Sequence, residues 1–525
     1  MTTDGTRTRK VWRWVGISVV LAVVVLAVVG QVMIDRAMPI LKGRVIETLS
    51  ARFKSRVEMD GFDVSVLKGL AIEGKGLRIY SPEDVVAAGW TKPLFTVDQF
   101  TFHASLTGLF VKPMHVGTVH VTGLTIEIPP KEMRQKAAGG AHVKRRITIV
   151  VDEIVCDRSR LVIETSKPGK EPKDFELEHI ELHAVGPNSP WRYEATLTNA
   201  IPKGEIHANG LFGPWQTEAP GESAVSGHYT FDHADLNTIK GIGGMLDSVG
   251  EFTGQLDRIA VEGTTETKDF SLDTANHPMP LETAFAAVVD GTTGDTYLTK
   301  VDATLGKTHF TTSGAVVNEK GVGHTIDLDL NVPNGRIEDF LALAVKTQPA
   351  IMTGTIGMKA KLHIRPGKER VTQKLGMQGA FSIGMIHLTN PSWEDKIDMM
   401  SLRAEGDPKD AKPGAEDVHS AMKGQFTMEH GALNFSTLDY VLPGAEVKLA
   451  GVYSLDGDKF DFTGKVRTDA KVSQMVASRW KSLLLKPVDP FFHKNGAGAE
   501  IPVKISGTKS EPKFGLDLHQ KKDKQ

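Results

Sequence analysis

Apolar and polar residues alternate along most of the chain that follows Val57. The alternation is strict in the segments 325–332, 358–364 and 445–449, where every second residue is apolar. This pattern predicts β-strands with one apolar and one polar face. Such strands belong to antiparallel sheets, because parallel strands covered on both faces are apolar throughout. Four dipeptides that favour turns lie between the predicted strands: Asp290-Gly291, Asn334-Gly335, Pro443-Gly444 and Asp456-Gly457.

A weak internal repeat supports a sheet built from hairpins. Each copy has a glycine, an aromatic residue two positions later, an apolar residue two positions after that, and then a mostly polar turn. The copies are Gly227–Leu236, Gly379–Leu388, Gly424–Leu433 and Gly451–Phe460. Their irregular spacing favours a long meandering sheet over a solenoid or a propeller.

A helical period replaces the alternation in a few places. We expect short helices over 39–57, 336–347 and 471–485. We also expect a polar, helix-capable insertion over 131–144 and a mobile loop over 405–417. The first helix has two interpretations. It either lies on anionic lipid through its basic residues or caps the end of a sheet, and the second is favoured because its apolar stripe suits a sheet equally well.

One uncharged apolar run stands apart near the start of the chain. It extends from Trp14 to Ile34 and includes Val15, Leu21 and Leu26. About 20 residues rising ~1.5 Å each cross a hydrocarbon core of ~30 Å. Four basic residues precede the run, and the positive-inside rule places that flank in the cytoplasm. The run therefore predicts a single transmembrane helix with the remaining chain exported.

A cleaved signal peptide is the alternative interpretation of this run. The run exceeds the ~7–15 apolar residues of a signal peptide, and no A-x-A cleavage sequence follows it. No cysteine lies near its end, which excludes lipoprotein processing. An uncleaved anchor is therefore favoured.

Composition excludes some functions. The chain has 525 residues, a formal net charge of -2 and 40% hydrophobic residues. It lacks the basic excess of a general nucleic-acid-binding protein, so we expect no nucleic-acid partner. The 52 glycines and the low aromatic content of 7% suit many short strands and turns. Cys156 is the single cysteine, and we expect it to be a small buried side chain rather than a reactive thiol.

No catalytic motif occurs in the sequence. The nucleophile-elbow, zinc-protease, phosphate-loop and dinucleotide-binding patterns are all absent. His179 and His183 lie four residues apart and would share one face of a strand, but no third ligand has a matching spacing. Solvated histidines on a polar face are the favoured interpretation. We therefore expect no enzymatic activity, no metal and no cofactor.

The C-terminal third resembles the corresponding region of the AsmA family, which comprises anchored envelope proteins of bacteria with two membranes. The matching blocks are Gly431–Leu455, Ser482–Phe492, Gly496–Thr508 and Pro512–Leu516. The N-terminal layout is also similar, with one anchor, a short helix and a β-rich segment in which Lys112-Pro113 leads into Val119–Ile126. Residues 200–350 resemble the family only in character. None of these blocks is catalytic.

The resemblance implies a mainly β fold, in which one N-terminal transmembrane helix precedes a long, curved, mostly antiparallel sheet of repeated hairpins with a few short helices. It implies a single-pass protein of the inner membrane with its N-terminus in the cytoplasm and its bulk in the periplasm. The implied organisation is a cytoplasmic flank (1–13), a transmembrane helix (14–34), an N-terminal periplasmic β-rich region (35–350), an AsmA-like C-terminal β-rich region (351–519) and a charged tail (520–525).

Larger relatives look like bridges whose apolar groove carries phospholipid to the outer membrane. The resemblance thus implies a role in outer-membrane biogenesis, with phospholipid and other envelope proteins as partners. Acyl chains suit an apolar sheet face, because each buried methylene contributes ~0.8 kcal/mol. Candidate groove-lining residues are Ile326, Leu328, Leu330, Met358, Leu362, Ile364, Val447 and Leu449. The same alternation also fits a scaffolding protein with a closed core and no lipid, so both alternatives stay open.

Overall fold

The protein is mainly β, with a few short helices, in a computed structural model. The structure describes residues 42–43, 46–47, 49–50, 55–65, 70–81, 83–104, 114–130, 149–164, 173–186, 189–214, 216, 220–275, 277–319, 322–346, 348–414, 418–454, 459–478, 481–482, 486, 489–492, 498–508 and 511–517. None of the helices within these residues is long and apolar enough to cross a membrane. The predicted anchor, 14–34, lies outside them.

The chain divides into two compact units. Unit 1 comprises 1–166, 172–197 and 209–225, and unit 2 comprises 167–171, 198–208 and 226–525. The sequence-based boundary at residue 350 falls inside unit 2.

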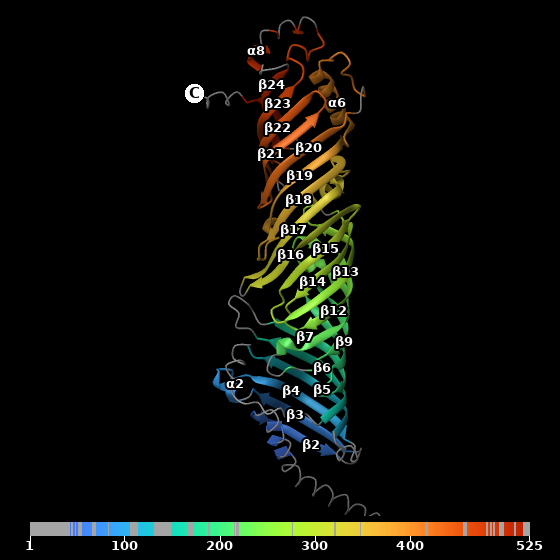
Figure 1. Cartoon of the computed structure of the whole chain (residues 1–525), viewed down its shortest axis with the longest axis vertical. Helices are drawn as coiled ribbons and strands as arrows, with labels where there is room; N and C mark the ends of the chain where they lie inside the picture. Colours follow the sequence, from blue (N-terminus) through green and yellow to red (C-terminus); the bar gives the residue numbers. More distant parts are fainter. Residues whose placement is uncertain are drawn as a thin grey trace, which may run out of the picture. The chain divides into compact units, whose positions relative to one another are not determined.

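In unit 1, each strand from the second onward pairs with the next one in the chain, and the first strand pairs with the third (Figure 1). They are β1 (Val57–Glu58), β2 (Gly61–Ser65), β3 (Leu70–Tyr80), β4 (Pro93–Ala104), β5 (Met114–Ile128), β6 (Ile149–Ile163) and β7 (Lys173–Val185), with the short helices α2 (Glu83–Ala87) and η2 (Pro220–Glu222). Strands β8 (Trp191–Ala200), β9 (Lys203–Phe212) and β10 (Ala224–Asp235) have residues in both units. The pair β5–β6 is parallel, whereas the other pairs with a defined register in this unit are antiparallel.

The core of unit 1 lies on the apolar face of its central strands. Val97, Val121 and Cys156 form a buried cluster against partly buried neighbours that include Phe100 and Ile180. The side chain of Cys156 is 1% exposed, which confirms the expectation of a buried thiol. Burial raises the pKa of this thiol to about 11, so it is uncharged at neutral pH.

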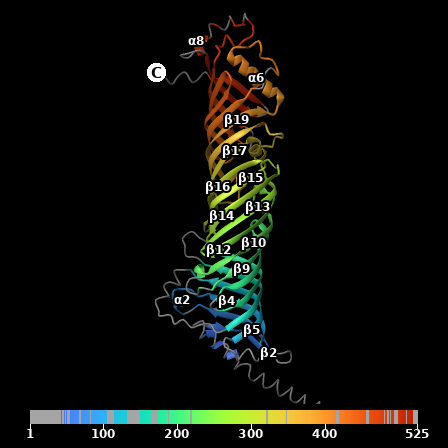
Figure 2. The ribbon, with the colours of Figure 1, turned by 45° about the vertical axis from the view of Figure 1, so that its right-hand side comes forward.

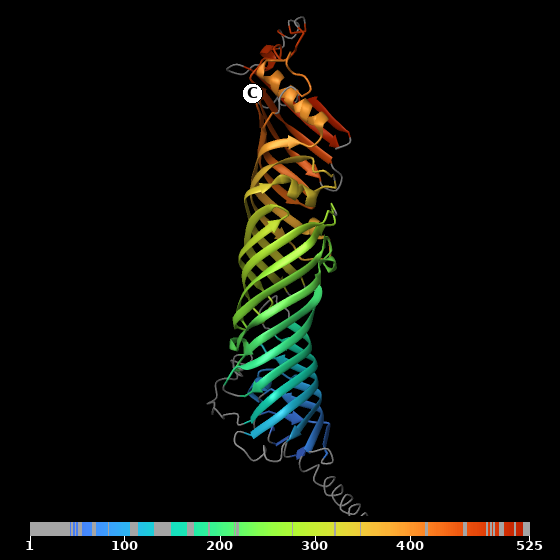
Figure 3. The ribbon, with the colours of Figure 1, turned by 90° about the vertical axis from the view of Figure 1, so that its right-hand side faces the viewer.

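Unit 2 is a long, curled, antiparallel sheet. Its elements are β10 (Ala224–Asp235), η3 (Leu236–Thr238), β11 (Ile242–Gly243), β12 (Met245–Gln255), β13 (Arg258–Leu272), β14 (Met279–Val289), β15 (Thr296–Leu305), β16 (Thr308–Glu319), β17 (Gly323–Arg336), α4 (Ile337–Ala344), β18 (Met352–Ile364), α5 (Val371–Lys374), β19 (Leu375–Leu388), α6 (Pro391–Glu405), β20 (Ser420–Glu429), β21 (Ala432–Leu442), β22 (Ala445–Ser454), β23 (Lys459–Thr468), α8 (Asp489–Phe492), β24 (Ala499–Thr508) and β25 (Pro512–Leu516). From β12 to β25, each strand pairs with the next one in the chain, as Figure 2 and Figure 3 show for β12 to β19.

The predicted strands are confirmed, and the helices only in part. The three alternating segments lie in β17, β18 and β22, and α4 forms within 336–347. In the first predicted helix, the described residues 42–43, 46–47 and 49–50 are helical, but Val57 begins β1. The helix predicted over 471–485 is wrong over 472–475, which form turns.

Hydrogen bonds within and beyond the segment account for the turns over 472–475. The Ser473 backbone N–H and hydroxyl donate to the Asp489 carboxylate at 2.9 and 2.7 Å, and the Lys471 N–H donates to the Gln474 side chain at 2.9 Å. Together with backbone hydrogen bonds from the Gln474 N–H to the Lys471 carbonyl and from the Met475 N–H to the Val472 carbonyl, these bonds hold the segment in turns.

Local backbone geometry shows that one predicted turn is wrong and that three copies of the repeat share a left-handed residue. Asn334-Gly335 is not a turn, because β17 continues through it with a bulge between Val332 and Gly335. The seventh residue of three repeat copies, His233, Met385 and His430, has φ between 50° and 53°. In the third copy this residue lies in the β20–β21 turn, whereas the first two copies continue as single strands. The repeat therefore marks a left-handed residue, which serves a turn or an irregularity within a strand.

Candidate functional site

The apolar residues of successive strands in unit 2 lie in register on one face of the sheet. One row crosses five strands through Gly314, Leu328, Leu362, Met377 and Met428, each paired with the next. The row continues on the following strands through Leu433, Tyr453 and Phe460. We call this surface the apolar face of unit 2.

All eight candidate lining residues lie on this face. Ile326 is paired with Ile364, and Leu328 with Leu362. Leu330 and Met358 lie in the adjacent rows on the same two strands, and Val447 and Leu449 lie on β22. Sequence alternation thus grouped all the candidates on one face, because side-chain direction in a regular strand follows parity.

Exposure along this face depends on distance from one long edge of the sheet. We call this the helix edge, because β17 passes into α4 there and β19 is followed by α6 (Figure 3). Near it, Val332, Ile356 and Ile383 are 1%, 4% and 5% exposed. Toward the opposite edge, side chains on the same strands, such as Leu328 and Leu362, remain partly exposed.

Helix α4 covers the apolar face at the helix edge. Ile337 on α4 belongs to a buried cluster with Ile356, Ile383 and Ile386, against which Phe340, Leu341 and Met358 also pack. The buried carboxylate of Asp339 accepts hydrogen bonds from the Thr308 hydroxyl at 2.7 Å and from the Lys307 N–H at 3.2 Å. These two bonds connect α4 to the start of β16, so the helix is held by polar contacts as well as by packing.

Helix α6 covers a second part of the same edge. Ala404 on α6 packs with Val418, Leu442 and Ala445 in a buried cluster. The Ser401 hydroxyl donates to the Pro443 carbonyl at 2.7 Å, and the buried Asp398 carboxylate accepts the Val418 N–H at 3.2 Å. Both helices therefore close the helix edge through the same combination of apolar packing and buried polar anchors.

Strand β20 departs from this gradient of side-chain exposure, because phenylalanine rings cover the strand. Phe426 is 7% exposed and lies next to Phe381 and Phe435, with ring centroids 6.1 and 6.4 Å away. Phe435 is followed by Phe462 at 5.9 Å. The rings lie beside cross-strand glycines: a Cβ on Gly424 would be 3.0 Å from the Phe381 ring. The glycine and aromatic positions of the repeat thus make room for this row of rings.

The opposite face of unit 2 is polar. Ion pairs cross neighbouring strands there, such as Lys361 with Asp329 at 2.8 Å and His363 with Asp327 at 2.6 Å. A depression of about 900 Å³ crosses β15 to β21 on this side, lined mainly by exposed polar residues. Of the candidate lining residues, only Leu330 borders it. The depression is therefore a feature of the polar face.

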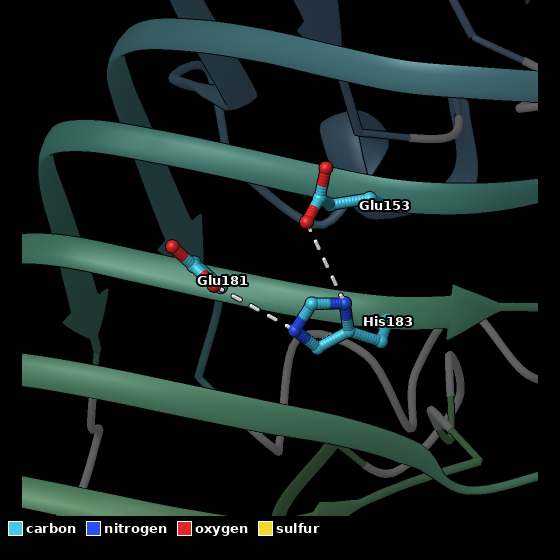
Figure 4. Close-up of side chains that lie close together, drawn as sticks. All are labelled: Glu153, Glu181 and His183. Atoms are coloured by element: carbon cyan, nitrogen blue, oxygen red, sulfur yellow. Dashed lines mark ion pairs between the residues drawn. The ribbon is translucent and has the colours of Figure 1, made fainter.

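In unit 1, the two histidines that sequence spacing had paired both contact the Glu181 carboxylate. The His179 Nδ1 and Nε2 atoms lie 2.7 Å from Asp157 and 3.0 Å from Glu181, and these two carboxylates, Glu181 first, raise the pKa of the imidazole. His183 instead lies between Glu153 and Glu181 (Figure 4). Sequence spacing missed Glu153 because it comes from β6, the neighbouring strand.

Comparisons with known proteins give no family assignment for this chain. No family model matches it. No curated protein and no solved structure matches it either.

Proposed function

We propose that the chain is an AsmA-like, inner-membrane-anchored periplasmic protein that holds phospholipid acyl chains against the apolar face of unit 2. This role would contribute to outer-membrane biogenesis. The resemblance of the C-terminal blocks motivates the envelope setting, and the apolar face motivates the cargo.

The observation that carries the proposal is the partial exposure of this face away from the helix edge. In a closed sandwich, a second sheet packs ~10 Å above the first and buries the inward side chains. On β17, by contrast, the apolar residues Ile326, Leu328 and Leu330 are all partly exposed. The acidic and polar residues that alternate with them point to the other face of the sheet. A continuous apolar surface that water reaches favours an apolar ligand.

The energetics are adequate for lipid binding. Covering ten methylene groups contributes on the order of 8 kcal/mol, from which the costs of association must be subtracted. The closed helix edge and the open opposite edge would let an acyl chain enter laterally while its headgroup stays in water.

Lipid extraction and mass spectrometry of residues 35–525, purified without detergent, test the proposal. We expect phospholipid to co-purify with the folded fragment and to decrease in Leu362→Glu. Gln378→Glu is the matched control, because it adds the same charge on the polar face of the adjacent strand, opposite Lys361. A folded fragment that carries no lipid would instead support the scaffolding alternative.

A further inference from the structure

We propose that unit 1 carries a site for a transition-series divalent cation, formed by Glu153, Glu181 and His183. Each residue offers one ligand atom, and the three atoms lie within 4.8 Å of one another. Among the residues that the structure describes, these three are the only His, Cys, Asp or Glu residues whose ligand atoms come together as a group of three or more. The proposed site is in unit 1 and is independent of the lipid proposal for unit 2.

Strand geometry brings the three side chains together. Glu153 on β6 is directly opposite His183 on β7, and Glu181 precedes His183 by two residues on the same face. The imidazole lies between the two carboxylates, with Nδ1 3.7 Å from Glu153 and Nε2 3.7 Å from Glu181 (Figure 4). Sites on paired strands are positioned more firmly than sites on loops.

The ligand atoms can contract to the separations of a metal site. Tetrahedral bonds of ~2.0–2.1 Å place neighbouring ligand atoms about 3.3 Å apart. The ion binds one imidazole nitrogen, so the carboxylate beside that nitrogen, at 3.7 Å, needs a contraction of only a few tenths of an ångström. The other carboxylate lies beside the other ring nitrogen, and its ligand atom, within 4.8 Å of the first nitrogen, must approach by up to about 1.5 Å. Rotation of the partly exposed glutamate side chains provides this change. All three side chains are about one-third exposed, at 33–34%, so a water molecule can complete the coordination.

Neighbouring groups orient the ligands. The Thr118 hydroxyl donates to the second oxygen of Glu153 at 2.8 Å, and the His179 Nε2 atom lies 3.0 Å from Glu181. Partners of this kind fix ligand orientation in metalloproteins. On β8, Arg192 is opposite His183 and Glu194 is opposite Glu181, so the flanking strand adds one charge of each sign.

The donor set selects the class of metal. One imidazole and two carboxylates suit Zn²⁺ and similar transition-series ions, whereas Ca²⁺ and Mg²⁺ prefer oxygen ligands throughout. A divalent ion would neutralise the two carboxylates beside a neutral imidazole. His363 in unit 2 offers a contrast, because among the described residues it pairs with a single carboxylate, that of Asp327.

Zn²⁺ titration of the tag-free full chain, in competition with a chelating dye, tests the site. Removing an outer-shell partner costs about 10–100-fold in metal affinity, so His183→Ala, which removes a ligand, should weaken the tightest site by more than about 100-fold. His363→Ala is the control and should leave this site unchanged. Glu181→Gln, which keeps the side-chain size, should also weaken it. Equal stoichiometry and affinity in the wild type and a folded His183→Ala variant would overturn the proposal.

X-ray absorption at the zinc edge gives an independent readout. With one equivalent of Zn²⁺, we expect a spectrum with nitrogen and oxygen ligands that includes one imidazole. A spectrum with two or more imidazoles would assign the ion to other histidines among the 18 of the chain and would contradict the site.

Discussion

A glutamate placed on the apolar face should destabilise the protein much more near the helix edge than toward the opposite edge. Leu328→Glu introduces a carboxylate into the partly exposed region, next to Leu362 and opposite Gly314. Ile356→Glu introduces the same group beneath α4, where the isoleucine is 4% exposed and packs with Ile337 and Ile383. The two variants differ mainly in the access of the new charge to water.

The magnitudes follow from burial. Ile356→Glu loses about 1.5–3 kcal/mol of apolar burial and leaves an unpaired buried charge that costs several kcal/mol more. Together these losses approach the total stability of about 5–15 kcal/mol that is usual for a domain. Leu328→Glu should lose only part of the burial contribution, about 1–2 kcal/mol, because its carboxylate stays hydrated.

Urea unfolding of residues 35–525, followed by far-ultraviolet circular dichroism, measures this difference, and lipid co-purification is scored on the same samples. We expect Ile356→Glu to lose its β-structure and Leu328→Glu to fold with reduced lipid. Gln378→Glu on the polar face should match the wild type in both assays. A Leu328→Glu variant as destabilised as Ile356→Glu would refute the open face and favour a closed core.

Three further predictions concern other parts of the chain. Cys156 should resist thiol reagents at pH 8 in the folded protein and react after unfolding. The pKa of the Cys156 thiol is about 11 in the folded protein and exceeds the usual 9.0, so its contribution to stability is full below pH 9 and is lost as the pH rises toward 11. The wild type should therefore lose up to about 2 kcal/mol more stability than Cys156→Ala over this pH range. An identical dependence of stability on pH in both proteins would contradict the pKa shift. Gly424→Ala should destabilise unit 2 by about 1–3 kcal/mol in urea unfolding, because the new Cβ would lie 2.7 Å from the Thr437 backbone carbonyl oxygen and 3.0 Å from the Phe381 ring; unchanged stability would mean that both the neighbouring strand and the ring can move away. Protease added to spheroplasts should degrade 35–525 and spare the anchored fragment, and a protected body would refute the periplasmic topology.

Local sequence patterns predicted the strands and their faces, because alternation reports side-chain direction without knowledge of the partner strand. Features that depend on a partner were harder to predict. Asn334-Gly335 has the composition of a turn, but pairing with β18 holds it in a bulge. Which edge of the sheet becomes buried also depends on where α4 and α6 pack, and the alternation of residues does not encode that position.

The missed helix α6 had recognisable sequence determinants. Asn390 caps it by accepting the Ser392 N–H, Pro391 occupies its first turn, and Gly406 ends it with φ of 106°. These residues are typical of helix ends, but the weak apolar stripe between them concealed the helix. The metal candidate had no comparable pattern, because Glu153 meets His183 only through the register of β6 and β7.

Photo-cross-linking in cells measures occupancy of the apolar face most directly. A benzophenone amino acid at position 362 of the full chain would report contacts on the apolar face, and the same group at position 378 would report contacts on the polar face of the neighbouring strand. After irradiation and purification, we predict by mass spectrometry a phospholipid adduct at position 362 and none at position 378. The absence of an adduct at position 362, or equal adducts at both positions, would contradict the proposal that this face holds lipid.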